Sequence, residues 1–289
     1  MKKKRWTLVQ IMILGFAILI LAGALLLMLP CSNADGKWLN ITDALFMSCT
    51  CVCVTGLATV VPAVQFSIFG KAVLLVLIQI GGIGILVSVT YLMVLMKKRL
   101  MLGTRVLLQN QFSMKSMSGV VKMLIYVVRG TFLVEGIGAA CLAVRFIPEY
   151  GWIKGICFSI FHSVSAFCNA GVDILGSDSL SRYQSDPWML LVIALLIITG
   201  GLGYLVWKDL TSFVKKLYRK EVRLGKAMQK LHLHTKIVLI MTAGLLICGG
   251  LFFTAAEWGN EATIGNLPVG EKLLAGFFQS VTVRTAGFS

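Results

Sequence analysis

Three stretches that share a pattern of Phe, small polar residues and Gly decide the fold: FMSCTCVCVTGL (46–57), FHSVSAFCNAGV (161–172) and FFQSVTVRTAGF (277–288). Each has Phe ten residues before a glycine, and Gly56, Gly171 and Gly287 follow one another at intervals of 115 and 116 residues. The first two stretches are also followed by matching glycine-rich runs, IGGIG at 80–84 and TGGLG at 199–203. Self-similarity at a fixed period indicates an internal repeat. The chain is therefore predicted to consist of repeated units.

The composition excludes an ordinary soluble domain. Of the 289 residues, 57% are hydrophobic and 13% are charged, whereas soluble domains carry about 25% charged residues. This composition is typical of a polytopic membrane protein. The net charge is nevertheless +15, from 27 Lys and Arg against 12 Asp and Glu. In a soluble chain that excess would indicate nucleic-acid binding, so the side of the bilayer on which it lies has to be determined.

Five apolar segments are long enough to cross about 30 Å of hydrocarbon as helices. They are Thr7–Ala34, Ala72–Met96, Met123–Val144, Pro187–Trp207 and Ile237–Ala256. The third segment contains Arg129, which we expect to reach the cytoplasmic interface, and Glu135, which we expect to meet another helix. Three further apolar stretches, 44–70, 155–172 and 273–283, are rich in Ser, Thr, Cys and Gly.

Positive charge predicts the topology. Lys2–Arg5, 97–122 and 208–236 are strongly basic and are therefore predicted to be cytoplasmic, as is the N-terminus. Two spanning helices separate each successive pair of basic segments, so 44–70 and 155–172 must enter from outside and return there. Irregular backbone persists at membrane depth only where it is packed in protein or lines a polar path. The three stretches are therefore predicted to be re-entrant half-helices that lead into pore loops.

The charge excess becomes an orientation signal once it is divided by side. This topology gives a net charge of +17 inside and −2 outside, which removes the reason to expect nucleic-acid binding. A cleaved signal peptide is an alternative for the basic start and its apolar run. The run is too long for a typical signal sequence, and Pro30-Cys31 is a poor cleavage site. A retained first helix is therefore favoured.

Each predicted half-helix ends at the membrane midplane, where its negative dipole end favours a cation. The following glycine lets the chain turn back with dihedral angles that a Cβ atom would penalise. Exposed carbonyl groups of such a segment can replace the hydration shell of a cation. The pattern thus predicts an all-α integral membrane protein, in which parallel helix–pore-loop–helix repeats surround a cation pore. It would have five transmembrane helices and three re-entrant pore half-helices.

The three loops resemble a known family. CVTGL (53–57), AFCNAGVD (166–173) and QSVTVRTAGF (279–288) are similar to the first three filter loops of the Trk/Ktr/HKT potassium-transporter superfamily. The resemblance covers essentially the whole chain and is closest to the KtrB-like membrane subunit of bacterial Ktr systems. It implies potassium uptake through four such units folded around one pore. In this family a Ser in place of the first filter glycine goes with sodium preference, so Gly56 resembles the potassium-selective form.

The resemblance also implies which residues form the selectivity filter. The potassium-binding positions would be Val54, Thr55, Gly56, Asn169, Ala170, Gly171, Thr285, Ala286 and Gly287. Weaker candidates are the preceding residues Cys53, Cys168 and Arg284. A cation beside a cation filter would repel the transported ion, so we expect Arg284 to point behind the filter and pair with an acid such as Asp173.

Partners and location are further implications of the resemblance. Family members are multi-pass plasma-membrane homodimers that associate with a cytosolic nucleotide-binding regulatory subunit of the KtrA/TrkA type. K+ would be the transported ion, Na+ is an open choice as a coupling or activating ion, and no cofactor or enzyme activity is expected. The basic segments 97–122 and 208–236 are either solvated loops or contacts for the regulatory subunit or membrane lipid.

The predicted repeats are residues 1–118, 119–233 and 234–289. Their spacing makes the chain about 2.5 units long. The resemblance implies four units, so the third inner helix and the fourth unit would be absent from this chain. We therefore expect that this chain alone does not conduct, and restored potassium uptake by it in cells that lack uptake systems would contradict this. The alternative function is a non-conducting membrane scaffold that binds a regulator.

A membrane redox or metal protein is the remaining alternative, suggested by Cys49, Cys51 and Cys53 and by His232 and His234. Alternate cysteine spacing matches neither a zinc motif nor a redox pair, so packing of small residues is favoured. The two histidines lie in a basic segment, where solvated interface positions are favoured over a metal site or a pH sensor. Paired catalytic carboxylates and a nucleophile motif are also missing from the sequence.

Overall fold

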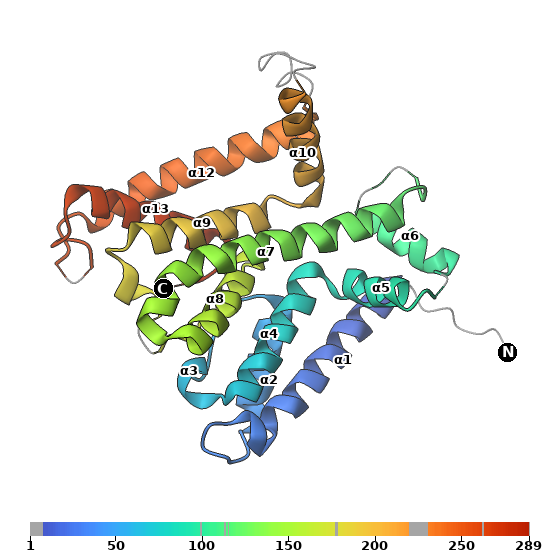
Figure 1. Ribbon diagram of the computed structural model, residues 1–289, viewed down its shortest axis with the longest axis horizontal. Helices are drawn as coiled ribbons and strands as arrows, with labels where there is room; N and C mark the ends of the chain where they lie inside the picture. The colour runs from blue at the N-terminus through green and yellow to red at the C-terminus, as the bar shows by residue number, and fades with distance from the viewer. Residues whose placement is uncertain are drawn as a thin grey trace.

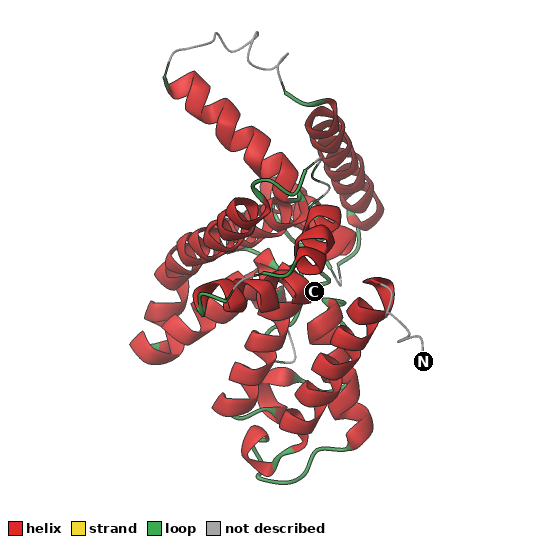
Figure 2. Cartoon of the chain, turned by 90° about the vertical axis from the view of Figure 1, so that its right-hand side faces the viewer, coloured by secondary structure: helices red, strands yellow, loops and turns green. Residues whose placement is uncertain are grey.

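The computed structural model describes residues 8–98, 100–112, 114, 116–176, 179–219, 231–261 and 263–288, and helices dominate them (Figures 1 and 2). No β-strand occurs in these ranges, and the one extended pairing is an isolated bridge between Asn33 and Phe66. The helices are α1 (Leu8–Met28), η1 (Pro30–Ser32), α2 (Ile41–Cys53), α3 (Pro62–Gln65), α4 (Ile68–Ile83), α5 (Ile85–Leu95), α6 (Leu102–Gln111), α7 (Val120–Tyr150), α8 (Trp152–Phe167), η2 (Ser181–Tyr183), α9 (Pro187–Gly201), α10 (Tyr204–Tyr218), α12 (Leu233–Glu257) and α13 (Val269–Thr285).

One packing arrangement recurs along the chain. We call α2, α8 and α13 the loop helices, because each leads into one of the three glycine stretches. Each loop helix packs against the helix before it, α1, α7 or α12. The helix after a loop helix, α4 or α9, packs against that loop helix and also against the next one along the chain. In Figure 1 the sets α1–α2–α4, α7–α8 and α9–α12–α13 follow one another across the molecule.

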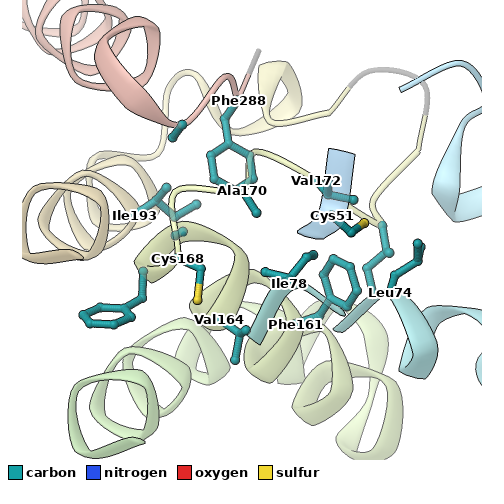
Figure 3. Packing of buried hydrophobic residues seen from close by; sticks show 14 of the residues in the cluster. Cys51, Leu74, Ile78, Phe161, Val164, Cys168, Ala170, Val172, Ile193 and Phe288 are labelled. Carbon is teal, nitrogen blue, oxygen red and sulfur yellow. The ribbon is translucent and has the colours of Figure 1, made fainter. Parts of the chain in front are cut away.

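A single core joins these sets. Inward-facing apolar residues of α2, α4, α8, α9 and α13 form one cluster with the glycine stretches, as Figure 3 shows for Ile78, Phe161, Ile193 and Phe288. The outward faces carry large exposed apolar side chains, such as Leu251. Helices that are apolar on every side are typical of membrane proteins, because lipid replaces water around them. The prediction of an all-α fold is therefore confirmed for the described residues, and the apolar outward faces agree with a membrane environment.

Glycines break two helices that the sequence predicted to be continuous. The prediction of a continuous helix over 72–96 is wrong, because α4 and α5 meet at Gly84 with a bend of 99°. The prediction of a continuous helix over 187–207 is also wrong, because α9 and α10 are bent by 106° at residues 202–203. The φ angles of Gly84 and Gly203 are +93° and +84°, values that a Cβ atom would penalise. A hydropathy pattern contains no signal for such a change of direction.

Two helices, α7 and α12, are long and apolar enough to cross a bilayer alone, and the bent pairs would bring the number in the described residues to four. The helix predicted over 7–34 ends at Met28, because Pro30, which lacks an N–H group, begins a short 3₁₀ turn. The count of five spanning helices and the re-entrant course stay predictions.

Candidate functional site

The three glycine stretches meet in space. We call residues 54–57, 169–172 and 285–288 the first, second and third glycine loops. Each follows the C-terminal end of a loop helix. Their glycines have positive φ angles of +80° at Gly56, +62° at Gly171 and +80° at Gly287. The Cα atom of Gly287 lies 3.6 Å from the position that a Cβ atom would take at Gly56. Segments more than 100 residues apart are therefore in direct contact.

Backbone carbonyl oxygens gather at this contact. A Cβ atom at Gly56 would lie 2.7 Å from the carbonyl oxygen of Ala286 and 3.2 Å from that of Ala170. A Cβ atom at Gly287 would lie 3.9 Å from the carbonyl oxygen of Thr55. Each of these oxygens belongs to the residue directly before a loop glycine. The three loops thus bring equivalent carbonyl groups together, and there is no space for a side chain at Gly56 or Gly171.

A cavity of about 310 Å³ adjoins the loops. Gly56, Gly171 and Gly287 all line it, together with residues 58–62. Among the described residues that line it, Asp173 carries the one carboxylate. That carboxylate accepts a hydrogen bond from the backbone N–H of Leu175 at 3.1 Å. The cavity therefore combines a carboxylate with the exposed backbone of all three loops, which is a favourable setting for a cation.

Hydroxyl groups tie each glycine loop to its own helix. In the first loop, Thr50 Oγ1 accepts from the backbone N–H of Leu57 at 3.1 Å. In the second and third, Ser165 Oγ donates to the carbonyl of Val172 at 2.6 Å, and Thr282 Oγ1 donates to that of Phe288 at 2.9 Å. In every case the partner is the residue directly after the loop glycine. The loops are thus held by equivalent side chains, a repetition that the sequence analysis missed.

A second repeated contact fixes each loop helix to the helix before it. One serine in each loop helix donates a hydrogen bond to a backbone carbonyl of the preceding helix. A glycine three residues after that carbonyl leaves space for the hydroxyl group. The three sets are Ser48, Ile20 and Gly23; Ser163, Glu135 and Gly138; Ser280, Leu246 and Gly249. The donor–acceptor distances are 2.7, 2.6 and 3.1 Å. These serines and glycines recur at nearly the repeat period, a signal that was available in the sequence.

The third unit is one residue shorter between this serine and the loop glycine. The separation is eight residues from Ser48 to Gly56 and from Ser163 to Gly171, but seven from Ser280 to Gly287. The ungapped alignment of the three stretches is therefore wrong within the third loop helix, where Phe278 rather than Phe277 takes the place of Phe161. Phe278 and Phe161 are both buried.

The missing residue explains a difference in backbone conformation. Val54 and Asn169, two residues before their glycines, have left-handed φ angles of +57° and +59°. In the third unit Thr285 is still the last residue of α13, and Ala286 has a φ of −103°. Thr285 Oγ1 donates a hydrogen bond to Asn169 Oδ1 at 2.9 Å, which links the second and third loops. The three loops are therefore similar but not equivalent.

Two of the three weaker filter candidates, Cys168 and Arg284, lie against neighbouring helices. Cys168 is 8% exposed and packs against Gly82 of α4, and an Arg284 Nη atom lies 2.9 Å from the Cβ position of Gly201 in α9. Cys53 is exposed. The expected pairing of Arg284 with Asp173 is wrong. No ion pair joins these two described residues, because Asp173 faces the cavity whereas Arg284 lies against α9.

The residues behind the metal and redox alternative are dispersed. Cys51 is fully buried in the core, whereas Cys49 and Cys53 are exposed with their sulfur atoms 4.0 Å apart. His232 Nδ1 lies 3.1 Å from Asp209 Oδ1 in an exposed pair. Within the described part of the chain, no three His, Cys, Asp or Glu side chains are arranged to hold a metal ion.

A helical membrane chain whose glycine loops bring backbone carbonyls together has the architecture of an ion-transport protein. Comparison with known families specifies which one. The chain belongs to the TrkH family, described as cation transport proteins, whose profile matches residues 7–289. This is a family of transporters rather than of enzymes.

Individual relatives agree with this assignment. The chain is 41% identical, over 99% of its own length, to the potassium/sodium uptake protein NtpJ of Enterococcus hirae. It is 37% identical to the Ktr system potassium uptake protein B of Bacillus subtilis, over 99% of its length, and of Vibrio alginolyticus, over 97%. The chain spans 60%, 61% and 59% of these three relatives, respectively.

Proposed function

We propose that this chain takes part in potassium uptake, with the three glycine loops as part of the selectivity filter. The single observation that carries the proposal is the convergence of the carbonyl groups of Thr55, Ala170 and Ala286 at the loop glycines. Backbone carbonyls can replace the hydration shell of K+ without a fixed negative charge. The names of the relatives, which include potassium and potassium/sodium uptake proteins, agree with this ion.

The filter positions are proposed from the family resemblance, and this geometry supports them. The backbone oxygens of Val54, Thr55, Gly56, Asn169, Ala170, Gly171, Thr285, Ala286 and Gly287 are proposed to bind the ion in passage. The loop helices would direct their C-terminal, partially negative ends toward it. Asp173 would attract cations into the cavity in front of the loops. Cys168 and Arg284 would support the loops from behind, and Cys53 stays a weaker candidate for a filter position.

The wider assembly is proposed from topology and from the relatives. We infer that α2, α8 and α13 are re-entrant half-helices of parallel repeats, and that the basic segments 97–122 and 208–236 face the cytoplasm with the N-terminus. Two relatives are named as parts of a Ktr system. A homodimer in the plasma membrane with a cytosolic nucleotide-binding subunit is the corresponding proposal for this chain, with Na+ as an optional coupling ion.

Uptake measurements test the proposal. The gene product, in its full encoded length, is expressed in bacterial cells that lack their own potassium uptake systems, and internal K+ is followed after addition to depleted cells. Wild type is expected to restore uptake and Gly171→Ala to abolish it. Gly36→Ala is the matched control, because Gly36 also has a positive φ, of +67°, but has open space around it. Wild-type protein that reaches the membrane and gives no uptake would overturn the proposal.

The 289-residue chain is measured in parallel with the full gene product. Uptake by both proteins would mean that three glycine loops are sufficient. Uptake by the full gene product alone would mean that these residues supply part of the pore and need the remainder. Either result is informative about which segments conduct, because the Gly171 and Gly36 variants can be compared in both backgrounds.

A further inference from the structure

We propose that Glu135 is a positioning residue for the second glycine loop and that it sets how well the pore discriminates K+ from Na+. This inference rests on the proposed function, since it concerns the same filter. Glu135 lies in the middle of α7, is 4% exposed and lines no cavity of the ion path described above. Its role would be indirect and would act through the residue that precedes the loop.

The carboxylate of Glu135 joins three elements that meet behind the second loop. The side-chain amide of Gln79 in α4 donates to both of its oxygens, at 3.0 and 3.2 Å. The thiol of Cys168, at the end of α8, donates to the same carboxylate at 3.8 Å. The backbone carbonyl of Glu135 also accepts the hydroxyl group of Ser163 at 2.6 Å. One residue therefore holds the loop helix and the base of its loop.

Cys168 transmits this contact to the filter. It directly precedes Asn169, the left-handed residue that begins the loop, and Ala170 and Gly171 follow. The Cys168 side chain is enclosed between Glu135 and Gly82, whose Cβ position would overlap it. A shift of Cys168 would consequently move the carbonyl groups of Asn169 and Ala170. Filters distinguish K+ from Na+ by the separation and field of such carbonyls.

Burial of this carboxylate is costly, which argues for a specific role. A carboxylate at membrane depth needs hydrogen bonds or a charged partner. Among the described residues no Lys or Arg forms an ion pair with Glu135, so the Gln79 amide and the Cys168 thiol carry that task. Ionisable groups inside membrane helices are typically functional for this reason.

The equivalent junction between the second and third units has different chemistry. There, Ile198 of α9 takes the place of Gln79, Leu246 of α12 that of Glu135, and Arg284 that of Cys168. Ile198 lies two residues before Gly200, as Gln79 lies two residues before Gly81. Leu246 lies three residues before Gly249, as Glu135 lies three residues before Gly138. Two of the three positions are thus apolar here, and the hydrogen-bonded set of Gln79, Glu135 and Cys168 is not repeated. The polar set at the first junction is therefore not a requirement of the fold, and we assign it to the second loop.

The experiment compares K+ and Na+ uptake by the full gene product in the potassium-uptake-deficient cells. Glu135→Ala removes the acceptor for two donors, and Cys168→Ala removes the thiol. Each variant is expected to lower the ratio of K+ to Na+ uptake by roughly fivefold, which corresponds to the usual net contribution of one hydrogen bond. The double variant should lower the ratio no further than Glu135→Ala alone, because both changes break the same link. Cys168→Ser, which keeps a donor, should retain most of the wild-type ratio.

Leu124→Ala is the matched control for lost stability. Leu124 is fully buried on the same helix, in a separate apolar cluster 11 residues before Glu135. It should lower the amount of protein in the membrane without changing the ion ratio. An unchanged ratio in Glu135→Ala, or additive effects in the double variant, would overturn the inference. If Glu135→Ala does not reach the membrane, the ion ratios of Cys168→Ala and Cys168→Ser are compared instead. Equal ratios in these two variants would overturn the inference. A wild type that fails to transport K+ would instead refute the proposed function.

Discussion

Substitution of Gly171 by Ala probes the contact between the glycine loops. Gly171 has a φ of +62°, and its Cβ position overlaps the carbonyl oxygen of Ala286 and lies 2.9 Å from the carbonyl carbon. A left-handed Ala costs about 1–2 kcal/mol. Displacing a backbone carbonyl from a packed site adds about 1–3 kcal/mol. We therefore expect Gly171→Ala to lower the free energy of unfolding by about 2–5 kcal/mol.

Gly36→Ala separates the two contributions. Gly36 has a similar φ of +67°, but nothing lies within 4 Å of its Cβ position, so only the backbone cost of about 1 kcal/mol remains. Both variants are unfolded by denaturant in mild detergent, and the midpoints are converted to free energies. The unfolding temperature is then compared in K+ and in choline. Wild type and Gly36→Ala should be stabilised by K+, and Gly171→Ala should not. Equal losses of stability in the two Ala variants would refute the interpretation that the loops touch at Gly171.

Three further changes test other parts of the structure. Ser163→Ala should lower the free energy of unfolding by about 1 kcal/mol, the usual net value of a buried hydrogen bond. Ser212→Ala, at an exposed position, should have no effect. Equal losses in the two variants would contradict the role of Ser163. Gly84→Ala should straighten the 99° bend between α4 and α5. Pulsed EPR measures the distance between spin labels at the outer ends of the two helices. An unchanged distance would show that φ at Gly84 does not set the bend. Burial, and then the hydrogen bond of its hydroxyl to Glu149 at 2.6 Å, raise the pKa of Tyr183. Its stabilisation is therefore present below the ordinary Tyr pKa of about 10 and is lost as pH rises through the raised value. Tyr183→Phe should cost about 1 kcal/mol at pH 8 and progressively less above pH 10 in thermal unfolding, and a deficit that does not change with pH would contradict this assignment.

Patterns of residue type predicted most of the architecture. Hydropathy located α7 and α12 to within a few residues, because about 20 apolar residues in a row have few alternatives to a helix. The period of the loop glycines identified the three segments that meet in space. Such a repeat carries long-range information, because equivalent residues tend to take equivalent places in each unit. The family resemblance then indicated K+ as the expected transported ion.

Features that depend on exact backbone direction could not be predicted in this way. The breaks at Gly84 and Gly203 lie in sequences as apolar as an unbroken helix, so composition contains no signal for them. The one-residue shortening of the third unit was hidden because the alignment was anchored on Gly287. The contact of Arg284 with α9 depends on three-dimensional packing between units. A search for repeated serines, in contrast, would have found the contacts that fix the loop helices.

The two left-handed residues before the loop glycines should respond differently to replacement by Gly. Val54 is β-branched, and its φ of +57° is strained for such a residue. Val54→Gly relieves about 1–2 kcal/mol of strain, which offsets the lost side-chain packing and the added chain entropy. Asn169 tolerates this conformation and also accepts the hydrogen bond from Thr285. Asn169→Gly therefore has little strain to release and loses a link between two loops.

We expect Asn169→Gly to lower the free energy of unfolding by about 1 kcal/mol more than Val54→Gly, since it also loses about one hydrogen bond. Denaturant unfolding in detergent measures the difference, and Thr285→Val is a control that removes the same hydrogen bond from the other side. The reverse order of stabilities would mean that the Val54 conformation is not strained. If the order holds, a strained residue is retained in the first loop although Gly would fit there. Strain of this kind concentrates where geometry is needed for function, and the carbonyl of Val54 is one of the proposed ion ligands. Val54→Gly should then leave stability nearly unchanged while it lowers the ratio of K+ to Na+ uptake.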